Sequence, residues 1–264
     1  MILNTPDELY LPDATVVALV GAGGKTSLMT AMAAHALRRG ETVIRTTTTK
    51  LAATTTEPVF WDGRNLSLPR LQAHLRHGNL QNRSMTLVRD RDTATGKLLG
   101  LAPEAVDLLA GSGLADRIFV EADGARGKVI KAPANHEPVI PHSTNLVIGI
   151  VGADALGVPM VNEHVFRPER LAALCDALPI AAVDACVLAR LVGHPQGLFK
   201  NAPASPCRRL VFVNKMEKAG EAAWDLLRHA RKLVKAAQPN GQRCATPWFA
   251  GSVHEGWVRS VDGN

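Results

Sequence analysis

The sequence predicts an α/β protein of three layers, in which helices flank a mainly parallel sheet as in P-loop NTPases. Apolar, β-branched runs alternate along the chain with helical stretches. A glycine-rich loop ending in Lys-Thr joins the first of these strands to the first helix. We expect the 264 residues to form a single domain, with a peripheral excursion over about 52–115 and a small helical insertion over about 155–204.

The amino-terminal part has the pattern of a βαβ unit. Residues 14–20 (ATVVALV) are apolar and β-branched and stop at a glycine cluster, which predicts a buried strand. Residues 25–37 are rich in Ala, Leu and Met, and the Arg38-Arg39-Gly40 that follows is typical of a helix end. Residues 42–46 (TVIRT) predict the second strand, so the glycine loop lies between strand and helix.

The rest of the chain continues the alternation. An edge strand at 85–89 is expected to form a hairpin with a short strand at 97–101. Further strands are expected at 117–122, 145–151, 210–214 and 245–251, and helices at 103–110, 168–178, 183–191 and 217–237. The helices at 168–178 and 183–191 make up the expected insertion.

Composition excludes several classes of protein. No apolar run approaches the roughly 20 residues of a membrane helix, and the amino terminus lacks the pattern of a signal peptide, so we expect a cytoplasmic protein. The net charge of +6 comes with only 4% aromatic residues and no docking motif, which argues against a nucleic-acid partner. The four cysteines form no CxxC pair, so no zinc site is predicted.

The glycine loop has the composition of a phosphate site. It comprises Gly21, Ala22, Gly23, Gly24, Lys25, Thr26 and Ser27. Glycines let backbone N–H groups approach phosphate oxygens, the lysine reaches the β and γ phosphates, and the threonine hydroxyl is suited to Mg²⁺. The pattern G-x-x-G-K-T is two residues shorter than the usual loop, as in Mur-type ligases. We therefore expect ATP or GTP to bind with Mg²⁺.

Two other strand ends carry polar side chains that should reach the same edge of the sheet. Thr47, Thr48 and Thr49 follow the second strand and are candidates for contact with the nucleotide. Glu121 and Asp123 follow the strand IFV and are candidates, with Lys25, for catalysis and, with Thr26, for the metal. One of the two acids would belong to the coordination shell of Mg²⁺ and the other would activate water, and the sequence does not decide which acid has which role.

Two more segments are candidates for recognition. Asn214 and Lys215 end a strand and resemble the N-K-x-D element that reads the base in GTPases, although Glu217 stands where that element has aspartate. Arg126 and Lys128 belong to a basic, glycine-containing loop that could clamp an anionic substrate.

A family resemblance covers most of the chain. The motifs VALVGAGGKTS, TTTTK, FVEADGARGK, KAPANHEPVIP, EHVFRPE, HPQGLFK and LVFVNK, in this order, resemble the YqeC family of selenium cofactor biosynthesis or selenium-dependent hydroxylase accessory proteins. The resemblance implies a P-loop protein that acts in the maturation of molybdenum hydroxylases, with such a hydroxylase or its cofactor as partner. It also draws Lys131, His136, Glu137 and Arg167 into the substrate site.

Two alternatives to a nucleotide-hydrolysing accessory enzyme stay open. One is a nucleotide-gated chaperone or scaffold with negligible hydrolysis, whose contact surface would be the helical insertion. The other is a Mur-ligase-like ATP-dependent kinase or ligase that acts on a small anionic substrate. Base preference and oligomeric state are left undecided by the sequence.

Overall fold

The strand that leads into the glycine loop is buried from end to end. In the computed structural model, which describes residues 9–51, 57–61, 69, 71–73, 83–237 and 246–262, this strand is β1 (Val16–Gly21). It lies between two parallel neighbours, β10 (Leu146–Gly152) and β8 (Arg117–Glu121). A strand enclosed in this way meets apolar surface on both faces, which explains its unbroken apolar sequence.

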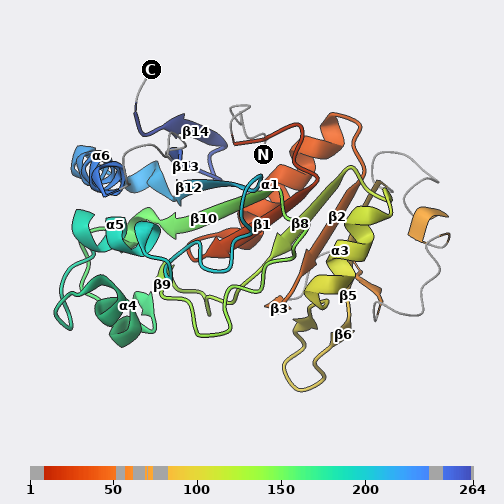
Figure 1. Cartoon of the computed structure of the whole chain (residues 1–264), viewed down its shortest axis with the longest axis horizontal. Coiled ribbons are helices and arrows are strands. Elements are labelled where there is room, and N and C mark those ends of the chain that lie inside the picture. The colour runs from red at the N-terminus through yellow and green to blue at the C-terminus, as the bar shows by residue number, and fades with distance from the viewer. Residues whose placement is uncertain are drawn as a thin grey trace.

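Around β1 runs a nine-stranded sheet in the order β14-β13-β12-β10-β1-β8-β2-β5-β4 (Figure 1). Its remaining strands are β2 (Val43–Thr47), β4 (Val59–Phe60), β5 (Ser84–Val88), β12 (Arg208–Asn214), β13 (Trp248–Ser252) and β14 (Trp257–Ser260). Every pairing among them is parallel except that of β13 with β14. The carboxyl ends of the central strands therefore meet at one edge, where ligands bind in sheets of this kind.

Helices cover both faces of the sheet. They are α1 (Lys25–Arg38), α3 (Pro103–Gly111), α4 (Pro168–Cys175), α5 (Ala185–Gly193) and α6 (Glu221–Ala236), with short 3₁₀ turns η2 (Ala153–Ala155) and η3 (Met216–Lys218). Figure 1 shows α3 beside β5 at one end of the sheet and α4, α5 and α6 gathered at the other.

The alternation of side chains along β1 assigns the helices to their layers. Val17 and Leu19 share a core with Leu28 and Met32 of α1. Val20 points to the opposite face of the sheet and belongs to the core built with α4, α5 and α6. A third core contains α3 and lies on this same face, opposite α1. Since successive strand residues point to opposite faces, α1 forms one layer and the other helices the second. The predicted three-layer α/β fold is confirmed.

The hairpin expected between residues 85–89 and 97–101 differs in the structure. The strand expected at 85–89 is not an edge strand with a hairpin partner: β5 pairs in parallel with β2 on one side and β4 on the other. The hairpin forms one step later, between β6 (Asp90–Arg91) and β7 (Leu98–Leu99), and β3 (Lys50–Leu51) joins it in a separate three-stranded sheet. Burial of Met85 and Leu87 explains why β5 stays in the main sheet.

The helix expected at 217–237 begins later than predicted. Residues 216–218 form η3, and α6 starts at Glu221 with Gly220 as its N-cap. A small parallel pair between β9 (Ile130–Lys131) and β11 (Val165–Phe166) was not expected from the sequence. In the described part of the chain no helix is long and apolar enough to cross a membrane.

Candidate functional site

The glycine loop between β1 and α1 is shaped by close backbone contacts. Gly23 and Gly24 have φ angles of +97° and +126°, which side-chain-bearing residues rarely adopt. A Cβ on Gly23 would lie 2.2 Å from the backbone nitrogen of Gly152, and one on Gly24 would lie 2.3 Å from Nδ2 of Asn214. Both positions therefore require glycine, and the loop is held against the ends of β10 and β12.

Lys25, the first residue of α1, lies at the centre of the site with only 4% of its surface exposed. Its Nζ donates a hydrogen bond to the carbonyl oxygen of Gly21 at 2.7 Å. The same nitrogen is 3.2 Å from Oδ1 of Asp123 and 3.7 Å from Oε1 of Glu121. The lysine thus balances the charge of the two buried carboxylates, and all three predicted catalytic side chains converge.

Glu121 and Thr26 form the part of the site suited to a divalent cation. The Thr26 hydroxyl donates to Oε2 of Glu121 at 2.8 Å, because the end of β8 lies next to the end of β1. Burial raises the pKa of Glu121, and the charge of Lys25 and the hydrogen bond from Thr26 offset only part of this rise. A hydroxyl and a carboxylate are ligands that Mg²⁺ accepts, with water and phosphate oxygens completing the octahedron. Among the described residues no cluster of three or more His, Cys, Asp or Glu is placed to hold a metal.

Asp123 is fixed by the loop and by a second lysine. Its Oδ2 accepts the backbone N–H of Gly21 at 3.0 Å and lies 3.0 Å from Nζ of Lys131. Its Oδ1 is buried and accepts no hydrogen bond from any residue that the structure describes, although Lys25 lies at ion-pair distance. Within the described residues this oxygen therefore faces the charge of Lys25 without a hydrogen-bond donor of its own.

A buried ionic network extends from Asp123 away from the loop. Lys131 is 1% exposed, and its Nζ lies 2.8 Å from Oε2 of Glu137 and donates to the carbonyl oxygen of Gly124 at 2.7 Å. Nη1 of Arg167 lies 2.7 Å from the same Glu137 oxygen. Burial alone would raise the pKa of Glu137, but the hydrogen bonds from Arg167 and Lys131 outweigh it and lower the pKa to about 2. Lys131 and Glu137 therefore stabilise the site from inside.

The other residues of the predicted substrate group lie nearer the surface. The guanidinium groups of Arg126 and Arg167 lie 5.1 Å and 4.1 Å from the ring centre of Phe166. Lys128 donates to the carbonyl oxygen of Glu163 at 3.1 Å, and His136 is exposed on its loop. The structure thus places both arginines against one aromatic ring, whereas no such contact is shown for Lys128 or His136 among the described residues.

The threonine run after β2 is largely used to join strand ends. The Thr47 hydroxyl donates to the carbonyl oxygen of Glu121 at 2.7 Å and accepts the backbone N–H of Thr49 at 3.0 Å. The Thr48 hydroxyl donates to the carbonyl oxygen of Val139 at 2.6 Å. These bonds hold the chain around Glu121, and contact of the hydroxyls with a nucleotide stays a prediction.

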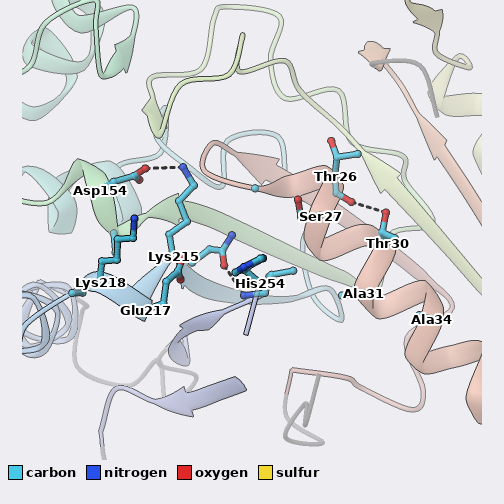
Figure 2. Close-up of a pocket in the computed structure, with 15 residues that line it drawn as sticks. Thr26, Ser27, Thr30, Ala31, Ala34, Asp154, Lys215, Glu217, Lys218 and His254 are labelled. Carbon is cyan, nitrogen blue, oxygen red and sulfur yellow. Dashed lines mark hydrogen bonds and ion pairs between the residues drawn. The ribbon is translucent and has the colours of Figure 1, made fainter. Parts of the chain in front are cut away.

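A cavity of about 880 Å³ opens next to the glycine loop (Figure 2). It starts at Gly24, Thr26 and Ser27 and follows one face of α1 to the ends of β12 and β13. Its further lining residues are Thr30, Ala31, Ala34, Ala153, Asp154, Asn214, Lys215, Glu217, Lys218, Ala219, Val253 and His254. The volume lies within the range of ligand pockets.

Most of this lining was missed by the reasoning from sequence. A usable signal was the row of small residues on α1, Ser27, Thr30, Ala31 and Ala34, at the i, i+3, i+4 spacing of one helix face. Val253 and His254 follow a strand that carries no motif, so only the folded chain brings them here.

The two predicted base-reading residues line this cavity, but both are engaged within the protein. Asn214 donates from Nδ2 to the carbonyl oxygen of Gly23 at 2.9 Å and accepts the backbone N–H of Val253 on Oδ1 at 3.0 Å. Lys215 pairs with Asp154 at 2.6 Å. Asn214 therefore joins the phosphate loop to the end of β13.

Two comparisons by sequence agree with the motif pattern. The family model described as YqeC protein matches residues 17–169. A protein of Escherichia coli (strain K12), described as uncharacterized protein YqeC, is 38% identical over 209 residues, which cover 79% of this chain and 78% of that protein. Among solved structures, a GTPase in apo form from Pyrococcus abyssi matches over 91% of both chains at 12% identity and a TM-score of 0.36.

Proposed function

The chain belongs to the YqeC family, and we propose that it binds a nucleoside triphosphate with Mg²⁺ at the loop Gly21–Thr26 and cleaves the γ-phosphoryl group. The observation that carries this proposal is the buried Lys25, held at the start of α1 beside two carboxylates by a loop in which Gly21, Gly23 and Gly24 leave no room for a Cβ. A buried lysine whose partners can be exchanged for phosphate oxygens is what phosphoryl transfer requires.

The residues around the loop fit both the nucleotide and the metal. The glycine cradle leaves backbone N–H groups at the amino end of α1, which favours anions. Thr26 and Glu121 would hold Mg²⁺, and the metal would supply charge neutralisation on the phosphates. The adjoining cavity along α1 has room for the nucleoside.

In this proposal the protein's own side chains divide the work. Lys25 leaves the carbonyl oxygen of Gly21 and neutralises charge on the transferred phosphoryl group. Asp123 keeps its bonds to Gly21 and Lys131, so its free Oδ1 stays oriented and accepts a proton from the attacking water or substrate. Glu121 remains the alternative base, with Asp123 then in the metal shell.

We place this activity in the maturation of selenium-dependent molybdenum hydroxylases, on the strength of the motif resemblance that the family assignment supports. The guanidinium groups of Arg126 and Arg167 both lie against the ring of Phe166, and Arg167 is linked to Asp123 through Glu137 and Lys131. They are suited to an anionic group of the hydroxylase or of its cofactor. Purified partner added to the hydrolysis assay should raise the rate, and no change in rate would remove this assignment.

The decisive experiment is calorimetric titration with the β,γ-imido analogues of ATP and GTP plus Mg²⁺. Lys25→Ala should weaken binding by at least about 100-fold because a charge-assisted contact to phosphate is lost. The exposed α6 residue Lys232 supplies the control, since Lys232→Ala removes the same charge from the surface. Circular dichroism of both variants checks the fold. Failure of both analogues to bind, or wild-type affinity in Lys25→Ala, would overturn the proposal.

A hydrolysis assay separates turnover from gating. Binding without measurable release of phosphate, with or without a partner, would point instead to a nucleotide-gated scaffold. The ion pairs that engage both Glu121 and Asp123 are the observation that favours this second function, because a carboxylate neutralised by lysine is a weaker proton acceptor.

A further inference from the structure

The cavity beside the glycine loop has one end at the phosphate site and the other at a carboxylate. Gly24, Thr26 and Ser27 border it where the phosphates would lie. At the other end, Glu217 lines it from η3, three residues after the end of β12. A nucleotide whose phosphates occupy the loop would extend its base along α1 toward Glu217, so this inference rests on the proposed function.

The walls between these two ends are suited to a flat ring. Ala31 and Ala34 of α1 are small and leave space along the helix, and Val253 and Ala219 add apolar surface to the lining. His254 adds a ring at the rim. Such a slot accommodates a purine by apolar contact without distinguishing one purine from another.

Discrimination must come from polar groups, and Asn214 is not available for it. Both ends of its amide are used, one by Gly23 and the other by Val253. Lys215 is engaged with Asp154 at the side of the cavity. The role of these two residues is to hold the loop, the strand ends and the cavity together.

Glu217 provides the cavity with a carboxylate oxygen that can accept a hydrogen bond from a ligand. Its Oε2 is buried and accepts no hydrogen bond from the residues within the described ranges. Burial raises its pKa, but its own backbone N–H, the Ser252 hydroxyl and the nearby His254 and Lys218 outweigh that effect and lower the pKa. A charged carboxylate with a buried, unpaired oxygen is costly unless a ligand supplies N–H donors.

We infer that the cavity selects a guanine nucleotide, with the Glu217 carboxylate accepting hydrogen bonds from N1–H and the 2-amino group of the base. Guanine is the purine that presents two adjacent N–H donors on this edge. Adenine presents its unprotonated N1 there, an acceptor that would face the carboxylate and leave it unpaired. Glutamate in place of aspartate in the N-K-x-D pattern thus keeps the acceptor while lengthening its reach.

The test removes the hydrogen bond between Glu217 and the 2-amino group once by changing the base and once by changing the side chain. The β,γ-imido analogues of GTP, ITP and ATP are titrated with Mg²⁺ into the wild-type protein, Glu217→Gln and the control Glu221→Gln, an exposed residue of α6 paired on the surface with Arg228. Inosine lacks only the 2-amino group. Wild-type and control should bind the GTP analogue roughly 10- to 100-fold more tightly than the ITP analogue, and the ATP analogue more weakly still. In Glu217→Gln the GTP preference over ITP should fall to within about threefold.

The outcomes separate this inference from the function on which it rests. If the ATP analogue binds as tightly as the GTP analogue, or if Glu217→Gln keeps the wild-type preference for GTP over ITP, guanine selection by Glu217 is wrong while nucleotide binding stands. If none of the three analogues binds the wild-type protein, the proposed function itself fails. Glu217→Gln is isosteric and lies at the cavity wall, so its circular dichroism should match that of the control.

Discussion

Replacing Glu137 by glutamine tests the buried ionic network that supports Asp123. Oε2 of Glu137 accepts from Lys131 at 2.8 Å, from Arg167 at 2.7 Å and from the backbone N–H of Ala134 at 3.1 Å. These contacts lower its pKa from the ordinary 4.5 to about 2. At about 1.4 kcal/mol for each pKa unit, this shift means that folding stabilises the charged carboxylate relative to the neutral acid by about 3 kcal/mol.

Glu137→Gln should therefore lower the free energy of unfolding at pH 7 by about 3 kcal/mol, because a neutral amide loses the attraction of the two cations. Urea unfolding followed by circular dichroism measures the difference. Glu163→Gln, which removes an exposed carboxylate from the loop before Arg167, is the control and should change stability by less than about 0.5 kcal/mol.

The pH dependence has a definite sign. The folded pKa lies below the unfolded one, so this stabilisation is fully present above about pH 4.5 and is lost as the pH falls toward 2. The difference between wild type and Glu137→Gln should be constant from pH 8 to pH 5 and narrow below pH 4.5. A difference under about 0.5 kcal/mol at pH 7, or one that does not narrow in acid, would refute this account of the network.

Three further changes test the loop and the carboxylates. Gly24→Ala should lower the free energy of unfolding by roughly 1–3 kcal/mol and weaken nucleotide binding, because the new Cβ collides with Asn214. The control is Gly113→Ala, which also has a positive φ but lies in open space, and it should leave binding unchanged in the same titration. Asp123→Asn should bind nucleotide but hydrolyse it at least about 100-fold more slowly in single-turnover assays, and undiminished hydrolysis would remove Asp123 from the mechanism. Thr26→Ala should raise the Mg²⁺ concentration needed for nucleotide binding by roughly tenfold or more; an unchanged Mg²⁺ titration would exclude its hydroxyl from the metal shell.

The glycine loop could be found in the sequence because its determinants are local. The order of strand, glycines, Lys25, Thr26 and helix is written in a dozen consecutive residues, and the backbone angles at Gly23 and Gly24 permit little besides glycine. Glu121 and Asp123 could be placed near the loop for a related reason, since strands in a parallel α/β sheet bring their carboxyl ends to one edge. The alternation of apolar strands and helices likewise decided the layers.

Tertiary structure decided what depends on contacts between distant segments. Pairing of β5 with β2 and β4, rather than in a hairpin, follows from burial on both sheet faces, which the apolar run itself does not specify. The sequence spacing of Lys131 and Glu137 indicated no role for them, and only folding shows that they form buried ion pairs next to Asp123. Glu217 in the sequence is a departure from a motif, and only the packing of α1 against the ends of β12 and β13 gives its unpaired oxygen a cavity. Local geometry thus determined the glycine loop, and long-range packing determined which polar atoms near it keep an unused hydrogen-bonding capacity.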